Sequence, residues 1–177
     1  VLMDADSGEV LAAKNADASI YPASMTKVMT ALLVLEANPD LEAFSVCKAG
    51  KMSSGSVTGV SKSEKASMAG FRPGETATVR DLLYGVLLPS GAECCETLAR
   101  EVSGSEKVFV ELMNQKAAAL GMASTHFCNP TGLHDPEHVS TARDMAVLLR
   151  AAMQNEMFRR IFATARYTVP PTNLHPD

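Results

Sequence analysis

The chain is 177 residues long, the size of one ordinary domain, and its formal net charge at pH 7 is −4. Hydrophobic residues make up 46% of it and charged residues 20%, which is the balance of a soluble globular protein. The mild negative charge gives no reason to expect a nucleic acid as partner, and no apolar run has the length of a membrane-spanning helix. We expect one domain over residues 1–177. We also expect a leader before it, either processed or outside this sequence, because the chain opens on Val1 already inside a strand-like pattern.

Residues 1–13 have the pattern of a β-hairpin, because two short apolar runs flank a turn that contains Gly8. A polar connection follows, and a helix is then predicted from Ser24 to about Glu36. This helix is apolar on nearly every side, so we expect it to be buried within the domain.

Ser24 and Lys27 stand three positions apart at the start of this helix. One helical turn takes about 3.6 residues, so the two side chains would lie on the same face. A helix start favours developing negative charge, and burial lowers the pKa of a lysine toward that of a usable base. A serine beside a desolvated amine is a workable pair for covalent catalysis. Taken alone, the short pattern is also that of a capping serine and a surface lysine.

The chain from residue 41 onward is predicted to be mostly helical. Residues 41–70 give weak signals, apart from a loop at 53–56 and an edge strand expected at 57–61, and residues 72–75 predict a turn. Apolar spacing and caps predict four further helices. The first begins after Thr78 and ends at Pro89, the second runs through 95–102 and ends at Gly104, and the third runs from Ser105 to Gly121. A loop is expected over 126–136, and the fourth helix runs from Thr141 through Ala152. Residues 166–169 are predicted to form a final strand, so the domain would be helix-rich with strands only at its two ends.

Four cysteines are present, and their even number permits disulfides: Cys47, Cys94, Cys95 and Cys128. Their spacing matches no zinc or redox motif. Cys94 and Cys95 are neighbours that point in different directions on a helix, so we expect no bridge between them. We interpret the cysteines as mostly buried small apolar residues.

A second serine, Ser90, lies in a loop between Pro89 and Gly91. An S-x-x-K pair followed by a loop serine begins the motif set S-x-x-K, S-x-N and K-T-G of penicillin-binding proteins and serine β-lactamases. Together with its flanking sequence, the chain resembles the D-alanyl-D-alanine carboxypeptidases, the low-molecular-mass penicillin-binding proteins of bacterial cell walls. The stretches that carry the resemblance are residues 3–11, 21–27, 79–85, 87–91, 118–122, 125–127, 131–134 and 140–144. Nearly the whole chain is covered, except about residues 41–66.

The resemblance implies an α/β (α+β) fold of the serine β-lactamase and transpeptidase type, in which a helix-rich region packs on an antiparallel sheet. It also implies that Ser24 attacks the carbonyl between two terminal D-alanines of a peptidoglycan stem peptide, forming an acyl-enzyme that water hydrolyses. Lys27 would accept the proton of Ser24, and Ser90 would relay a proton to the leaving amine. The backbone N–H of Ser24 would be half of an oxyanion hole.

Further expectations about the site follow from the same resemblance. Gly91 and Ala92 would contact the substrate, and no metal or cofactor would be needed. His134 and His138 are four positions apart, but Pro136 between them disfavours a helix that would bring the imidazoles together. The expected partners are the stem peptide and β-lactam antibiotics. The expected location is outside the cytoplasmic membrane, secreted or anchored at its outer face, with membrane association only through segments outside this sequence.

Two departures from the family pattern stand out. Ala92 occupies the place of the asparagine in S-x-N, so another group must set the charge of Lys27. Glu93 is the nearest candidate and would raise the pKa of the lysine, and water is the other candidate. No K-T-G is present before Asp177, so we expect a domain whose C-terminal strands are missing. Two alternative functions therefore stay open, namely a catalytically weak penicillin-binding homologue that binds wall peptides and a serine β-lactamase.

Overall fold

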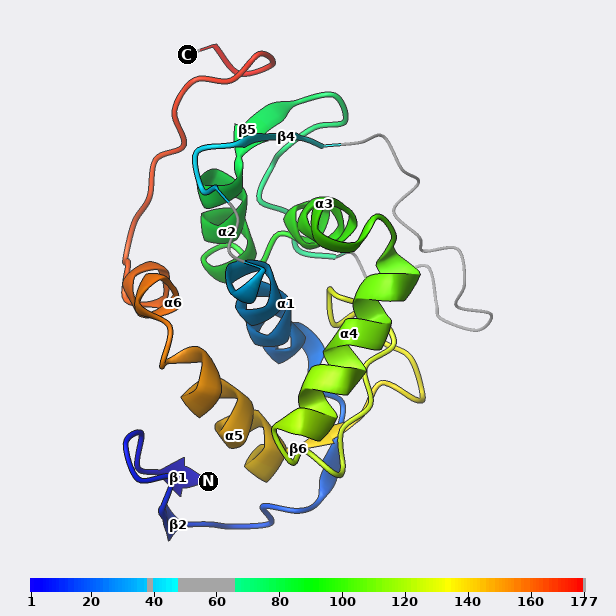
Figure 1. The fold of residues 1–177 in the computed structure, drawn as a ribbon, viewed down its shortest axis with the longest axis vertical. Helices are drawn as coiled ribbons and strands as arrows, with labels where there is room; N and C mark the ends of the chain where they lie inside the picture. Colours follow the sequence, from blue (N-terminus) through cyan, green and yellow to red (C-terminus); the bar gives the residue numbers. More distant parts are fainter. Residues whose placement is uncertain (38–39, 48–65, 177) are drawn as a thin grey trace.

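The computed structural model describes residues 1–37, 40–47 and 66–176. Helices surround one central helix, and three two-stranded antiparallel sheets lie around them within the described part of the chain (Figure 1). The elements are β1 (Leu2–Met3), β2 (Val10–Ala12), β3 (Ser19–Ile20), the 3₁₀ helix η1 (Ala23–Met25), α1 (Thr26–Glu36), β4 (Phe44–Val46), β5 (Thr76–Thr78), α2 (Val79–Leu87), α3 (Ala92–Ser103), α4 (Glu106–Ala119), β6 (Ser140–Thr141), α5 (Ala142–Ala152) and α6 (Glu156–Phe162).

Helix α1 is the centre of the hydrophobic core. It contacts all five other α-helices, α2 to α6, and in Figure 1 these lie around it. Met29, Leu32 and Val34 point from different sides of α1 and are all buried, which confirms that a helix with apolar residues all round is an interior helix. Because its neighbours fix α1 from several sides, the side chains of its first turn are held in a rigid frame.

Side-chain caps determine where the surrounding helices begin. Thr78 accepts a hydrogen bond from the backbone N–H of Asp81, and the Asp81 carboxylate accepts one from the backbone N–H of Thr78, so the expected capping box forms at the start of α2. Thr141 caps α5 by accepting from the N–H of Asp144 at 3.1 Å, and Ser105 caps α4 in the same way. These beginnings were all expected from the sequence.

The sheets agree only in part with expectation. Strands β1 and β2 form the predicted N-terminal hairpin. The pairs β3 with β6 and β4 with β5 were not predicted, so the statement that strands occur only at the two ends is wrong. These strands have two or three residues each, too few for a pattern of alternating side chains to be visible. The loop and edge strand predicted at 53–56 and 57–61 lie outside the described residues.

The strand predicted at 166–169 is wrong. This stretch has no strand partner within the described residues, and it passes along the outside of α2 (Figure 1). The Tyr167 ring stacks on that of Tyr84, with centroids 3.7 Å apart and planes 2° apart, and the Tyr167 hydroxyl donates to Asp81 at 2.6 Å. Side-chain contacts therefore hold the segment in place of a β-ladder.

Helix α6 was missed in the sequence, because its seven residues show only one turn of apolar spacing, from Phe158 to Ile161. The cysteines behave as interpreted, since all four are free and three of them are buried. Within the described residues, no helix combines the length and the apolar character needed to cross a lipid bilayer.

Candidate active site

The structure brings Ser24 and Lys27 together. Ser24 lies in η1 and Lys27 in the first turn of α1, so the expected helix begins with a 3₁₀ turn and becomes α-helical at Thr26. Lys27 Nζ lies 3.2 Å from Ser24 Oγ and donates to the backbone carbonyl of Thr131 at 2.6 Å. The amine is therefore held between the serine hydroxyl and a carbonyl from a distant loop.

The surroundings of Lys27 make its charged form less stable than it is in water. The residue is only 5% exposed, and desolvation by burial lowers its pKa from the ordinary value of 10.5. Cys95 and Glu93 act in the opposite direction with less effect. Both expectations about this lysine are confirmed in direction, since burial lowers its pKa and Glu93 raises it by a smaller amount. The Glu93 carboxylate is engaged elsewhere, since its Oε1 accepts the backbone N–H groups of residues 69–71.

Ser90 has an unusual conformation. Its φ is 65°, in the left-handed region that residues with a Cβ seldom adopt, and its buried Oγ has no hydrogen-bond partner among the described residues. Backbone strain and an unpaired buried hydroxyl both oppose stability, and such features concentrate at functional sites. A catalytic role for Ser90 stays a prediction, and these two features are compatible with it.

Ser24 and Lys27 lie between two cavities. The larger one, called here the Ser24 cavity, has a volume of 660 Å³ and is also lined by Tyr21, Ala92 and the 131–134 loop. The smaller one has a volume of 390 Å³, is walled by apolar side chains of α1, α2 and α5, and includes Ser90. The three predicted catalytic residues therefore share the wall of the smaller cavity, and two of them also face the larger one.

The two predicted substrate-binding residues differ in their placement. Ala92 lines the Ser24 cavity, and its backbone N–H donates to the carbonyl of Ser67 at 2.9 Å. Gly91 lines neither cavity. Its N–H donates to the carbonyl of Gly85 at 2.8 Å, and a Cβ on it would lie 2.7 Å from the Cβ of Ala69. Substrate contact through Gly91 stays a prediction, whereas its close packing is an observation.

The 129–134 loop contacts the backbone beside Ser24 and the Lys27 amine, and the sequence did not reveal these contacts. Asn129 Oδ1 accepts the N–H groups of residues 131–133, which folds the loop around its own side chain. Gly132 has a φ of 80°, and a Cβ on it would lie 1.9 Å from the carbonyl oxygen of Ala23. The loop thus touches the backbone beside Ser24 and also supplies the carbonyl that binds Lys27. Its Asn-Pro-Thr-Gly sequence indicates a turn, but not the partner of that turn.

The two histidines near the site have separate roles. His138 is buried, and its Nδ1 accepts the N–H of Cys128 at 3.1 Å, so its proton is on Nε2, which donates to Thr26 Oγ1 at 2.8 Å. Burial lowers the pKa of His138 to about 4, which keeps the ring neutral at physiological pH. The His134 ring instead meets that of Tyr21 edge-on at 4.6 Å. Among the residues that the structure describes, no three side chains are grouped as metal ligands would be.

The family model for D-alanyl-D-alanine carboxypeptidases, peptidase family S11, matches residues 1–170. The chain belongs to this family. It is 38% identical to the D-alanyl-D-alanine carboxypeptidase DacF of Bacillus subtilis, over 93% of this chain and 41% of that protein. It is 39% identical to the D-alanyl-D-alanine carboxypeptidase DacC of Escherichia coli, over 88% of this chain and 39% of that protein. The chain thus spans about two fifths of each of these relatives.

Solved structures of the family share the fold. A D-alanyl-D-alanine carboxypeptidase from Mycobacterium tuberculosis superposes with a TM-score of 0.81 at 37% identity, covering 95% of this chain and 60% of that one. A mutant of the Streptomyces K15 DD-transpeptidase gives a TM-score of 0.86 at 33% identity, covering 98% and 67%. The α/β class expected from the resemblance is confirmed, with helices and small antiparallel sheets arranged as in penicillin-binding DD-peptidases.

Proposed function

We propose that the protein is a serine D-alanyl-D-alanine carboxypeptidase that removes the terminal D-alanine from peptidoglycan stem peptides through an acyl-enzyme on Ser24. The observation that carries this proposal is the buried amine of Lys27, 3.2 Å from Ser24 Oγ at the wall of a 660 Å³ cavity. A nucleophile and a base within hydrogen-bond reach, beside a space that admits a substrate, are the minimum that acyl transfer requires. Membership of the family supports the choice of substrate.

Lys27 is proposed to be the base of the acylation step. A neutral amine has two protons and one lone pair, and one of its protons is directed to the carbonyl of Thr131. This bond leaves the lone pair free to accept the proton of Ser24 Oγ as that oxygen attacks the carbonyl carbon between the two D-alanines. An O–C bond forms, the C–N bond breaks, and the leaving amine takes up a proton. Water then attacks the ester, which frees the acid product and returns the proton to Ser24.

Ser90 is proposed to relay the proton to the leaving amine. Its Oγ is unpaired among the described residues, so no existing hydrogen bond has to break before it acts. The backbone N–H of Ser24 is proposed as one oxyanion donor. Loss of one such donor typically costs about 10²–10³ in rate.

The lowered pKa of Lys27 predicts how acylation depends on pH. Protonated lysine cannot accept a proton, so the rate of acylation by a penicillin should rise with pH and level off above the pKa of Lys27, which lies below 10.5. The measurement is the second-order rate constant for a fluorescent penicillin with the full-length protein across the neutral and alkaline range. Circular dichroism at each pH controls for unfolding. A rate that falls as pH rises, while the protein stays folded, contradicts Lys27 as the base.

Ala92 is predicted to slow the enzyme relative to relatives with asparagine at this position. An amide there would donate to the substrate carbonyl and accept from the neighbouring lysine, and the Ser24 cavity that Ala92 faces offers the room for it. Ala92→Asn in the full-length protein should raise the acylation rate about ten- to a hundredfold, because one or two such hydrogen bonds lower the activation free energy by a corresponding amount. Ala92→Leu is the control, because it adds similar volume without an amide. An unchanged rate in Ala92→Asn would show that the loop is adapted to alanine.

The same assays separate the alternative functions. A carboxypeptidase forms a long-lived penicillin adduct and releases D-alanine from a D-Ala-D-Ala peptide. A β-lactamase hydrolyses the adduct rapidly, and a weak penicillin-binding homologue becomes labelled without releasing D-alanine. Because stem peptides belong to the cell wall, we place the protein outside the cytoplasmic membrane, with stem peptides and β-lactams as its partners.

A further inference from the structure

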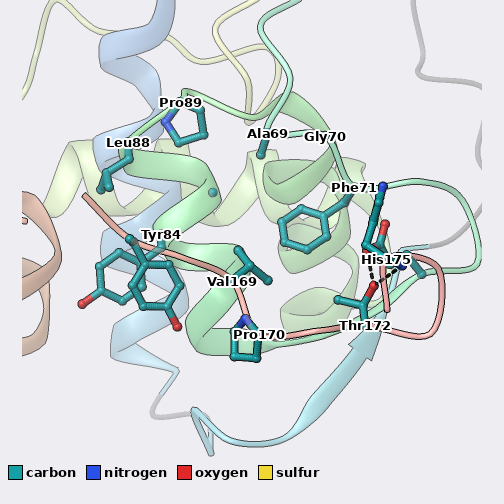
Figure 2. A pocket seen from close by; sticks show the side chains of 13 residues that line it. Ala69, Gly70, Phe71, Tyr84, Leu88, Pro89, Val169, Pro170, Thr172 and His175 are labelled. Atoms are coloured by element: carbon teal, nitrogen blue, oxygen red, sulfur yellow. Dashed lines mark hydrogen bonds and ion pairs between the residues drawn. The ribbon is translucent and has the colours of Figure 1, made fainter. Parts of the chain in front are cut away.

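A third cavity lies away from Ser24, Lys27 and Ser90. It has a volume of 370 Å³ and is lined by α2, residues 69–71 and the segment 165–176, and it is called here the α2 pocket. Its walls are mainly apolar, and Figure 2 shows the Phe71 ring facing Val169 and Pro170 across it, with Leu88 and Pro89 at one end. A volume of this size with apolar walls and a few polar groups is typical of a small-molecule site.

The segment 165–176 is fixed on both sides of the α2 pocket. On one side Tyr167 stacks on Tyr84 of α2. On the other side Asn173 Oδ1 accepts the backbone N–H of Thr76 at 2.8 Å, and Asn173 Nδ2 donates to the carbonyl of Gly74 at 3.0 Å. The pocket between these contacts is therefore built by defined interactions and is not a gap beside a loose chain.

The polar end of the α2 pocket consists of Glu75, Thr172 and His175, whose hydrogen bonds are dashed in Figure 2. Glu75 is 1% exposed and accepts from Thr172 Oγ1 and, at 2.7 Å, from His175 Nδ1. Burial raises the pKa of Glu75, but these hydrogen bonds outweigh it and leave the pKa below the ordinary 4.5. Glu75 accepts from Nδ1, so in the neutral form of the His175 ring the proton is on Nδ1 and Nε2 is a hydrogen-bond acceptor. Nε2 has no partner in the described part of the chain, and the His175 side chain is 43% exposed.

The chemistry of the walls defines the ligand. Phe71, Tyr84 and Tyr167 favour a planar ring, because aromatic faces and edges pack best against one another. Nε2 of the neutral His175 ring is able to accept from a ligand donor, and Glu75 beside it disfavours a carboxylate. We propose that the α2 pocket binds a small planar apolar molecule that carries one N–H or O–H donor, and that its occupant acts on the Ser24 cavity through residues 66–71.

Residues 66–71 form a wall that the two cavities share. Ala66 and Ser67 line the Ser24 cavity, whereas residues 69–71 line the α2 pocket. Both halves are bonded to the start of α3, because Ser67 accepts the N–H of Ala92 and Glu93 Oε1 accepts the N–H groups of residues 69–71. A molecule that packs on Phe71 thereby restrains the segment that forms one wall of the Ser24 cavity and that packs closely on Gly91, next to Ser90.

The binding test uses indole, a planar bicycle with one N–H donor, and 1-methylindole, which lacks the donor. Isothermal titration calorimetry with the full-length protein should show saturable binding of indole, and binding about five- to tenfold weaker for 1-methylindole, the worth of one neutral hydrogen bond. His175→Asn keeps a donor toward Glu75 but removes Nε2. It should lower the affinity for indole by the same factor and leave that for 1-methylindole unchanged.

The location test fills the pocket from within. Val169→Trp places an indole ring inside the α2 pocket and should abolish the binding of free indole. Thr168→Trp is the matched control, because Thr168 is the exposed neighbour that does not line the pocket, and it should bind indole like the parent protein. The absence of saturable binding in the parent protein, or equal binding in Val169→Trp, overturns the site.

The coupling test rests on the proposed function. Saturating indole should change the rate of Ser24 acylation by a penicillin about fivefold or more, the usual lower range for coupled sites, and should have no effect in Val169→Trp. If indole binds but the acylation rate stays unchanged, the proposed effect on Ser24 is overturned, while the α2 pocket remains a binding site. A full-length protein that penicillin does not acylate overturns the proposed function and this coupling together, while calorimetry still decides whether the pocket binds.

Discussion

Replacement of Ser24 by alanine in the full-length protein should abolish covalent labelling by a reporter penicillin, with a loss of at least roughly 10³-fold in rate. The reason is geometric, because Ser24 Oγ is the hydroxyl bonded to the buried amine of Lys27. Removal of Oγ leaves that amine without a nucleophile to activate. Mass spectrometry of the labelled parent protein should place the adduct on the peptide that contains Ser24.

The control for this experiment is Ser90→Ala, which keeps the nucleophile and its base. It should be labelled more slowly than the parent protein, with the adduct still on Ser24. Labelling that persists in Ser24→Ala, on any residue and at a comparable rate, would refute the assignment of the nucleophile.

Replacement of Gly132 by alanine should have the second-largest effect. A Cβ at this position would lie 1.9 Å from the carbonyl oxygen of Ala23 and 3.1 Å from the backbone nitrogen of Ser24, so either the loop or the serine backbone must move. Displacement of a nucleophile by about 1 Å typically costs about 10²-fold in rate. We expect at least that loss in the acylation rate, and a fall of about 2–4 kcal/mol in the free energy of unfolding, since the clash adds to the strain of a positive φ.

Gly121→Ala is the matched control for Gly132→Ala. Gly121 has a φ of 76°, close to the 80° of Gly132, but nothing lies within 4 Å of a Cβ built there. This variant should lose about 1–2 kcal/mol through backbone strain alone and keep the parent acylation rate. Equal acylation rates in both variants would mean that the contact between Gly132 and Ala23 does not position Ser24.

The parts of the site that could be predicted are those set by local geometry or by a motif. Ser24 and Lys27 share a face because they are separated by one helical turn, and the caps at Thr78 and Thr141 follow from short-range spacing. Ser90 was identified through the family pattern, whereas its strained φ and unpaired hydroxyl are visible only in the structure.

The parts that could not be predicted depend on contacts between distant residues. The carbonyl that binds Lys27 comes from Thr131, and no local pattern relates the two positions. Burial was expected to lower the pKa of Lys27 and does so, but the sequence did not show that the Glu93 carboxylate is turned to the backbone of residues 69–71. The segment 166–169 has the composition of a strand, but the Tyr167 ring stacks on Tyr84, and this contact holds the segment in place of hydrogen bonds to a neighbouring strand.

The long-range contacts of α1 have a consequence for the order of folding. Lys27 bonds to Thr131 across 104 positions, Thr26 bonds to His138 across 112, and β3 pairs with β6. Closing such long loops is entropically costly, so these contacts form after local helices do. Ser24 and Lys27 are adjacent as soon as the first turn of α1 exists, but the lysine stays hydrated until residues 131–141 are synthesised and dock. A nascent chain would thus carry the proposed nucleophile and its amine side by side, and the amine would become desolvated only when residues 131–141 dock.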